Sequence, residues 1–240
     1  MNIVLFDFVI ERILEIEVFE YASLLFNSLF LSICAAILTI ILGVFLVNTY
    51  ITSNNIIIRL SVSISRLGYA LPGVVLALGV IVPLITLDGY LKSIFGQYFN
   101  ITIGLIFSGT MIAIIYAYVI RFLTISYGTI ESGFVTLNPD ISAASRVLGQ
   151  SKYSTLLKIQ LPIIKPALIM SALLVFVDSM KELPATLILR PFNFDTLATH
   201  VYTYASLSQI EEAALPALTI VLAGLLPIIL INRELVRNKN

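Results

Sequence analysis

The chain has 240 residues, of which 59% are hydrophobic and 12% are charged, and its mean hydropathy is +1.02. Soluble domains carry about 25% charged residues, so this chain has too few polar side chains to cover a water-facing surface. The composition excludes a soluble globular protein and predicts an integral membrane protein folded as one bundle. The formal net charge is zero, so only the distribution of charge along the chain is informative.

Residues 1–20 precede the first long apolar run. They have no basic start, and the short apolar run Ile3–Ile10 is followed by several glutamates rather than by a small-residue cleavage site. This pattern is unlike a cleavable signal peptide. We expect an amphipathic segment on the extracytoplasmic surface, and a linker from a longer parent chain is the alternative.

Four charge-free stretches are long enough to cross a membrane, which takes about 20 helical residues. A fifth apolar run, near Ile163–Leu187, is interrupted by Asp178, Lys181 and Glu182 but is flanked by apolar sequence. Because continuous apolar runs without alternation form helices in lipid, the chain is predicted to be all-α, with about five transmembrane spans and possibly six. The other four spans are expected near Leu24–Val47, Leu67–Leu87, Ile101–Ile120 and Ala213–Ile231. Together they make a transmembrane domain over residues 21–232.

Pro72, Gly73 and Pro83 fall within the second predicted span. Proline and glycine loosen the hydrogen-bond ladder of a helix, so this span is expected to bend. Bent helices often line transport pathways, which makes Pro72 and Gly73 candidate pathway residues. Ordinary helix packing explains the same residues equally well.

A basic loop, residues 124–165, separates the third span from the charged fifth run. Cations avoid the extracytoplasmic side of membrane proteins, so this loop is expected to face the cytoplasm. If the spans alternate, ten of the fourteen Lys and Arg residues then lie on the cytoplasmic side, including Arg121 at the end of the third span. The same alternation places the N-terminus outside and the tail, residues 233–240, in the cytoplasm.

Two short helices are predicted in this loop. Asn138-Pro139-Asp140 is typical of a helix start, and Gly149 allows a sharp change of direction after the first helix. A second helix is expected over Lys152–Gln160, after which Pro162 directs the chain back toward the membrane. The first helix has an apolar face formed by Ile141, Ala144, Val147 and Leu148. A basic amphipathic helix pair lying on lipid headgroups is one interpretation.

The spacing Ala144-x4-Gly149-x9-Ile159-x-Leu161-Pro162 resembles the EAA loop of binding-protein-dependent ABC transporter permeases. The resemblance implies a MetI-like fold and a coupling helix that docks on an ATPase subunit. Ala143 stands where the family has glutamate, which weakens the expected ATPase contact more than the docking itself. The residues that carry this expectation are Ala143, Ala144, Ser145, Arg146, Leu148, Gly149, Ile159, Leu161 and Pro162.

Five further segments resemble the iron(III)-type branch of these permeases: Asn27–Leu29, Gly68–Gly73, Arg121–Leu123, Met180–Ala198 and Glu212–Ala217. That resemblance implies import of ferric ion delivered by a periplasmic binding protein, with two permease halves and two ATPase subunits. The chain is similar to the C-terminal half of a double-length permease, so it needs a second permease half, either another copy or a separate chain. Thiamine, polyamine, sulfate and molybdate permeases share the fold and the loop.

Asp178, Lys181 and Glu182 lie within the fifth predicted span. A charge at the centre of a bilayer costs about 2.5–3.5 kcal/mol on insertion scales. Their i, i+3, i+4 spacing predicts one helical face on which they pair locally. They are either a self-neutralising cluster near the outer end of the helix or residues that line the passage or contact the binding protein.

The sequence predicts no catalytic residues, cofactor or metal site. It has no Gly-x4-Gly-Lys-[Ser/Thr] phosphate loop, so ATP hydrolysis is left to another subunit. One histidine and one cysteine do not make a metal-ligand set. No nucleic-acid motif occurs in the sequence. Membrane lipid is the expected surrounding of the apolar helices. A secondary transporter or channel that needs no ATPase is the alternative function.

Overall fold

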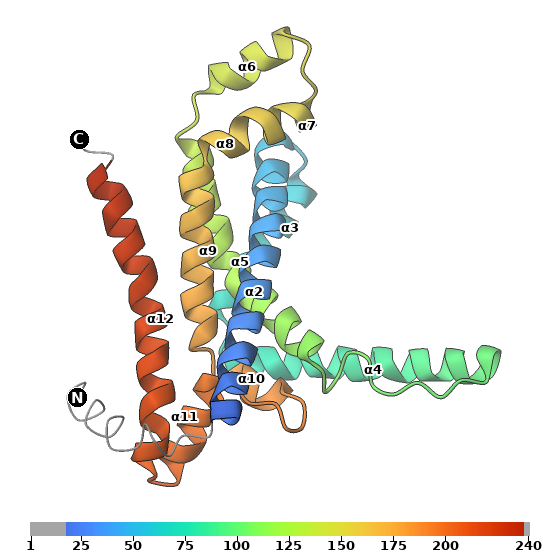
Figure 1. Cartoon of the computed structure of the whole chain (residues 1–240). Helices are drawn as coiled ribbons and strands as arrows, with labels where there is room; N and C mark the ends of the chain where they lie inside the picture. Colours follow the sequence, from blue (N-terminus) through green and yellow to red (C-terminus); the bar gives the residue numbers. More distant parts are fainter. Residues whose placement is uncertain (1–17, 238–240) are drawn as a thin grey trace.

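A bundle of long helices forms the body of the protein. The computed structural model describes residues 18–237, and every regular element in that range is a helix. Helices α2 (Val18–Thr52), α5 (Met111–Val135), α9 (Lys165–Met180) and α12 (Ile210–Arg237) run roughly along one axis (Figure 1). The predicted all-α bundle is therefore confirmed.

Three helical segments are long and apolar enough to cross a membrane: Phe19–Thr52, Gly73–Phe99 and Met111–Val135. A fourth is counted if two helical segments joined by a 74° bend, Lys152–Ile163 and Lys165–Met180, form one span. By this measure the described residues contain fewer spans than the five expected. Helix α12, with 28 residues, covers the whole of the last predicted span.

Small residues bring α2, α5 and α9 close together. A Cβ atom added to Gly133 of α5 would lie 2.6 Å from the Cβ of Ala167 in α9. The Ser126 hydroxyl donates to the Thr39 carbonyl at 2.9 Å and accepts from the Ser171 hydroxyl at 2.9 Å. Such small and hydroxyl side chains are the usual means by which helices associate in lipid.

The two ends of the bundle differ. One, which we call the loop end, carries α6 (Pro139–Val147), α7 (Lys152–Thr155), a π-helical turn (Leu156–Gln160) and α8 (Leu161–Ile163). The opposite end carries α10 (Pro184–Leu189), α11 (Leu197–Ser206) and the start of α2. Helix α12 runs back from the opposite end, so its C-terminal turn points to the loop end (Figure 1).

The predicted span Leu67–Leu87 corresponds to a helix of sufficient length and hydropathy, but this helix begins and ends later than expected and does not run along the bundle. Helix α3 (Ile56–Ser65) and a 3₁₀ turn (Gly68–Ala70) precede α4 (Gly73–Phe99), which crosses the bundle axis (Figure 1). The chain turns at Gly68 because only glycine fits there: an added Cβ would lie 1.9 Å from the Ile120 carbonyl oxygen. Pro72 has an extended conformation and caps α4, so the new helix begins at Gly73.

The predicted span Ile101–Ile120 is displaced by about ten residues. Residues 101–105 form no helix, Gly109 has a φ of +69°, and Thr110 caps α5 by accepting the backbone N–H of Ile112. Helix α5 then continues through Arg121 and Glu131 to Val135, because these charged side chains find partners in the bundle. The loop consequently covers residues 136–164 rather than 124–165.

The predicted span Ile163–Leu187 is broken. Helix α9 ends at Met180, and α10 begins at Pro184 after a three-residue break. Pro184 fits the first turn of α10 because it has no N–H to leave unpaired. Of the segment expected outside, residues 1–17 lie outside the described residues and 18–20 belong to α2; of the tail, 233–237 continue α12 and 238–240 lie outside the described residues.

Candidate coupling loop and buried ion-pair junction

The coupling loop, residues 136–164, begins with a well-capped helix. Asn138 accepts the backbone N–H of Asp140 at 2.9 Å, and Pro139 occupies the first turn of α6. Both features are favourable at a helix start. The predicted start of the first loop helix is therefore confirmed.

Gly149 ends α6 and turns the chain. Its φ is +81°, its N–H donates to the Arg146 carbonyl, and the N–H of Gln150 donates to the Ser145 carbonyl. These two bonds form a Schellman motif, in which a left-handed residue closes the helix. Glycine adopts this conformation without strain, so the sharp change of direction expected at Gly149 is confirmed.

A buried contact joins the two loop helices. The hydroxyl oxygens of Ser145 and Thr155 lie 2.8 Å apart, and both side chains are buried. Ser151 caps α7 by accepting the backbone N–H of Ser154. The second helix extends from Lys152 to Ile163, three residues beyond the predicted end. The loop is thus a packed helix pair in which Ser145 has an internal role.

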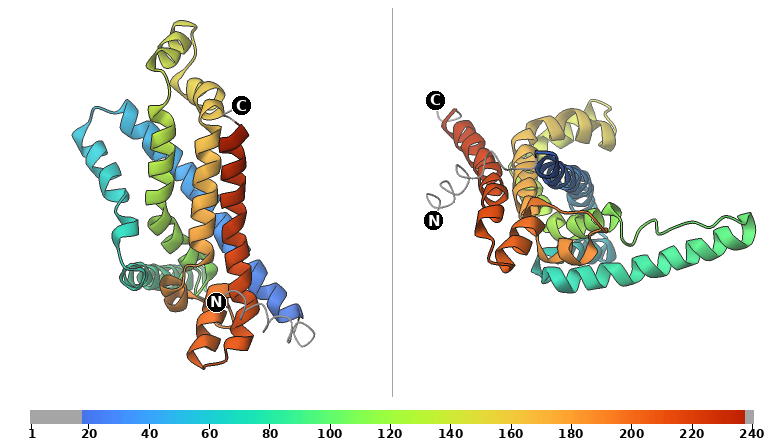
Figure 2. Two further views of the ribbon diagram at one scale, coloured as in Figure 1. Left: turned by 90° about the vertical axis from the view of Figure 1, so that its left-hand side faces the viewer. Right: turned by 60° about the horizontal axis from the view of Figure 1, so that its bottom comes forward.

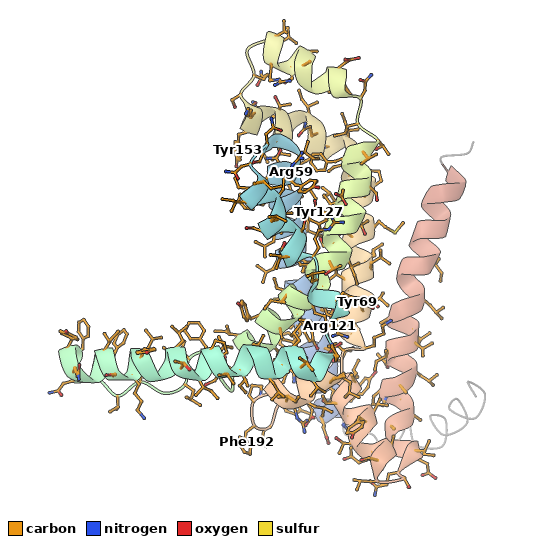
Figure 3. The ribbon with its side chains drawn as sticks, turned by 180° about the vertical axis from the view of Figure 1, so that it is seen from behind. Arg59, Tyr69, Arg121, Tyr127, Tyr153 and Phe192 are labelled. Atoms are coloured by element: carbon orange, nitrogen blue, oxygen red, sulfur yellow. The ribbon has the colours of Figure 1, made fainter. Side chains whose placement is uncertain are left out.

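An apolar surface remains uncovered on the coupling loop. Val147 is 87% exposed, Leu148 81% and Tyr153 71%. Helices α6 and α7 project beyond the bundle (Figure 1), and Tyr153 lies at this end in Figure 3. Large exposed apolar patches mark interaction sites. Of the other candidates, Ala143, Ala144, Arg146 and Pro162 are exposed, whereas Ile159 and Leu161 are partly buried.

A buried ion pair connects α5 with the break after α9. The Arg121 Nε lies 3.2 Å from Glu182 Oε2, without hydrogen-bond alignment, and the two side chains are 18% and 7% exposed. Arg121 also donates to the Leu71 carbonyl at 2.9 Å, and its guanidinium lies 5.5 Å from the Tyr69 ring centre. Tyr69 and Arg121 lie beside the start of α4 (Figure 3).

The second carboxylate oxygen of Glu182 fixes the surrounding backbone. It accepts the N–H of Ala185 at 3.2 Å in the first turn of α10. A Cβ atom on Gly73 would lie 3.0 Å from this oxygen, so glycine permits the start of α4 to approach. Arg121 and Glu182, with these neighbours, form what we call the ion-pair junction, which joins α4, α5 and α10.

The expectation that Asp178, Lys181 and Glu182 share one helical face is wrong for Glu182. The helix ends at Met180, which directs Glu182 to Arg121. Asp178 and Lys181 do pair, at 2.8 Å, and the lysine side chain is 59% exposed. Of the other pathway candidates, Gly73 is buried at the ion-pair junction, and Pro72 is exposed.

Arg121 belongs to a segment that carries the family resemblance but is not among the predicted site residues, and its contact with Glu182 makes it a functional candidate. It was assigned to the cytoplasmic boundary of a span, but it lies in the middle of α5, ten residues after its first residue. A charged residue inside a membrane helix is expected to have a partner in the bundle. With the boundaries of α5 known, the same rule would have directed attention to Arg121.

A second ion pair lies nearer the loop end. Arg66, after α3, is 3.1 Å from Glu131 of α5, and its guanidinium lies 4.3 Å from the Tyr127 ring centre. The Tyr127 hydroxyl donates to Glu131 at 3.2 Å. These contacts tie the end of α3 to the part of α5 that leads into the coupling loop.

Comparisons with known proteins agree with this architecture. A family model described as "Binding-protein-dependent transport system inner membrane component" matches residues 39–238. The chain is 29% identical over 217 residues to the Fe(3+)-transport system permease protein FbpB 2 of Haemophilus influenzae, which covers 89% of this chain and 39% of that protein. It is 32% identical over 195 residues to the ferric transport system permease protein FbpB of Actinobacillus pleuropneumoniae, covering 78% and 27%.

Solved structures share the fold at low sequence identity. A bacterial alginate ABC transporter, solved in complex with an alginate-bound periplasmic protein, has a chain that matches with a TM-score of 0.71 and 14% identity, covering 94% of this chain and 81% of that one. A chain of the MetNI methionine ABC transporter matches with a TM-score of 0.60 and 15% identity, covering 90% and 94%. The predicted MetI-like fold is confirmed. The chain spans well under half the length of the two ferric relatives.

Proposed function

The chain belongs to the family of binding-protein-dependent transport system inner membrane components, and we propose that it is a permease subunit of an ABC importer. In this role it forms part of the transmembrane pathway and does not hydrolyse ATP itself. A separate ATPase subunit drives it, and a periplasmic binding protein delivers the substrate. A second permease half completes the pathway.

The observation that carries this proposal is the coupling loop. A helix pair projects from one end of the bundle and presents Val147, Leu148 and Tyr153 without cover from the described chain. A groove on an ATPase subunit is a suitable partner for such an apolar helix face. The loop end then faces the cytoplasm, the C-terminus of α12 lies on the same side, and the N-terminus lies outside.

Ferric ion is the proposed substrate. The support is the likeness to two relatives whose names state ferric transport. Other relatives, 25% identical over 127 residues, are named for 2-aminoethylphosphonate transport. Uptake of radioactive ferric ion into cells that carry the complete transporter tests the choice. Uptake of 2-aminoethylphosphonate without iron uptake would overturn it.

The pathway residues have two proposed roles. Asp178 and Lys181, the more accessible pair, line the passage. Glu182 pairs with Arg121 and lies against Gly73, and this contact fixes the position of the helices beside the passage. Pro72 lies next to this contact in the sequence. Asp178→Ala and Glu182→Ala should both reduce uptake without lowering membrane insertion. Wild-type uptake by both variants would remove these residues from the pathway.

Two valines of similar exposure test the coupling loop. Val147 of α6 is 87% exposed, and Val135 at the end of α5 is 78% exposed. Val147→Glu places a charge in the proposed interface, which should weaken ATPase binding by about 2 kcal/mol or more, roughly 30-fold. Val135→Glu should bind as the wild type does. Co-purification of the ATPase measures both, and equal binding by the two variants would contradict the proposal.

A further inference from the structure

Helix α4 extends far beyond the bundle. Its first half packs against α5 and α10 through Leu76, Ala77 and Val80, which are buried. We call residues 85–108, the second half of α4 and the chain that returns from it, the arm. Within the arm, only Asp88 and Ser108 are buried. Figure 2 shows α4 and the returning chain projecting away from all other helices.

Hydrogen bonds to one side chain, Asp88, hold the two segments of the arm together. Asp88 accepts the backbone N–H groups of Ile106 at 3.1 Å, Phe107 at 3.0 Å and Ser108 at 2.7 Å. It also accepts the Ser108 hydroxyl at 2.6 Å. One buried carboxylate thus fastens the returning chain to α4.

Water is a poor surrounding for the arm. Tyr90 is 66% exposed, Tyr98 77%, Phe99 62% and Leu105 66%. These large side chains lie on a segment whose charged residues are Asp88 and Lys92. Exposed large apolar side chains gathered on one segment favour a site of interaction over a solvated face.

Lipid is a poor surrounding as well. Within the described part of the chain, the backbone N–H groups of residues 102–105 have no hydrogen-bond acceptor. Irregular backbone at membrane depth is tolerated only where protein covers it or where it lines a water-filled cavity. The side that carries these N–H groups therefore faces hydrogen-bond acceptors from protein or from water rather than lipid.

We propose that the arm packs against a second permease half of the same fold, with its apolar residues buried and its free N–H groups paired in that interface. This inference rests on the proposed function, which requires two halves. The ferric relatives are more than twice as long as the part of them that this chain matches. The arm would fasten the two halves together at the level of the ion-pair junction, where α4 begins.

Photocrosslinking in the assembled, membrane-embedded transporter tests the arm. A benzophenone amino acid replaces Tyr98 of the arm in one variant and Tyr153 of the coupling loop in another; the two tyrosines are 77% and 71% exposed. The adducts are identified by mass spectrometry. From position 98 we expect permease peptides, either from a second copy of this chain or from a separate permease chain of the same fold.

The two positions separate failure of the inference from failure of the proposed function. Adducts from position 98 that contain only lipid, the ATPase or the binding protein would overturn the inference, even if position 153 crosslinks to the ATPase. Absence of ATPase adducts from position 153 would instead count against the proposed function. Permease adducts from position 98 support the arm interface whether or not position 153 crosslinks to the ATPase.

Discussion

The ion pair between Arg121 and Glu182 gives a quantitative prediction for Glu182→Gln. This change keeps the side-chain shape but removes the counter-charge of the buried guanidinium, which retains its bond to the Leu71 carbonyl and its contact with the Tyr69 ring. At 3.2 Å and an effective dielectric constant of about 20, the lost attraction is about 5 kcal/mol before desolvation is considered. Removal of one partner from a buried pair costs about 3–5 kcal/mol, and we expect about 3 kcal/mol because two contacts remain. The detergent-purified protein should therefore unfold about 6–12 °C lower.

Asp178→Asn is the matched control for this experiment. It breaks an ion pair whose lysine is 59% exposed, so the expected loss is about 0–1 kcal/mol. The double variant Arg121→Met with Glu182→Met removes both charges and should recover most of the stability. The reasoning is refuted if Glu182→Gln unfolds within about 2 °C of the wild type, or if Asp178→Asn is equally destabilised.

Two glycine pairs give further predictions, measured as thermal unfolding in detergent. Gly149→Ala should cost about 1–2 kcal/mol because φ is +81° with open space around it, whereas Gly96→Ala in the exposed part of α4 should be neutral or stabilise by up to about 1 kcal/mol. A loss at Gly96 equal to that at Gly149 would contradict the left-handed conformation. Gly133→Ala should cost about 1–3 kcal/mol because its Cβ would overlap Ala167, while Gly128→Ala in the same helix meets nothing. Equal stability of these two variants would contradict the close packing of α5 and α9.

Local patterns allowed the coupling loop to be predicted closely. The cap at Asn138, the reversal at Gly149 and the second short helix all depend on neighbouring residues, and all lie where expected. Helix caps and turns are determined by a few adjacent side chains, so sequence order alone can reveal them. The exposure of Val147 and Leu148 could not be predicted from neighbouring residues. An apolar helix face indicates that the face is buried, but not whether it is buried against the same chain or against another protein.

The spans were predicted less well because tertiary contacts decide where they begin and end. Hydropathy ended the third span before Arg121, but Glu182, 61 positions later in the sequence, allows α5 to continue. Asp88 similarly holds residues 106–108 in an irregular conformation that their apolar character does not predict. Neither contact has a sequence-local signal. Charge and proline positions indicated that these regions were unusual, but not how they were arranged.

Cysteine crosslinking from the coupling loop tests the proposed function most directly. In a Cys34→Ser background, Leu148→Cys places a single thiol on the exposed loop surface, and Phe192→Cys places one on a fully exposed residue of the loop after α10. Phe192 lies at the end of the molecule away from Tyr153 (Figure 3). With a thiol-to-amine crosslinker applied to the assembled transporter, position 148 should join the ATPase subunit and position 192 should not. An ATPase adduct from position 192, or none from position 148, would contradict a permease driven through its coupling loop.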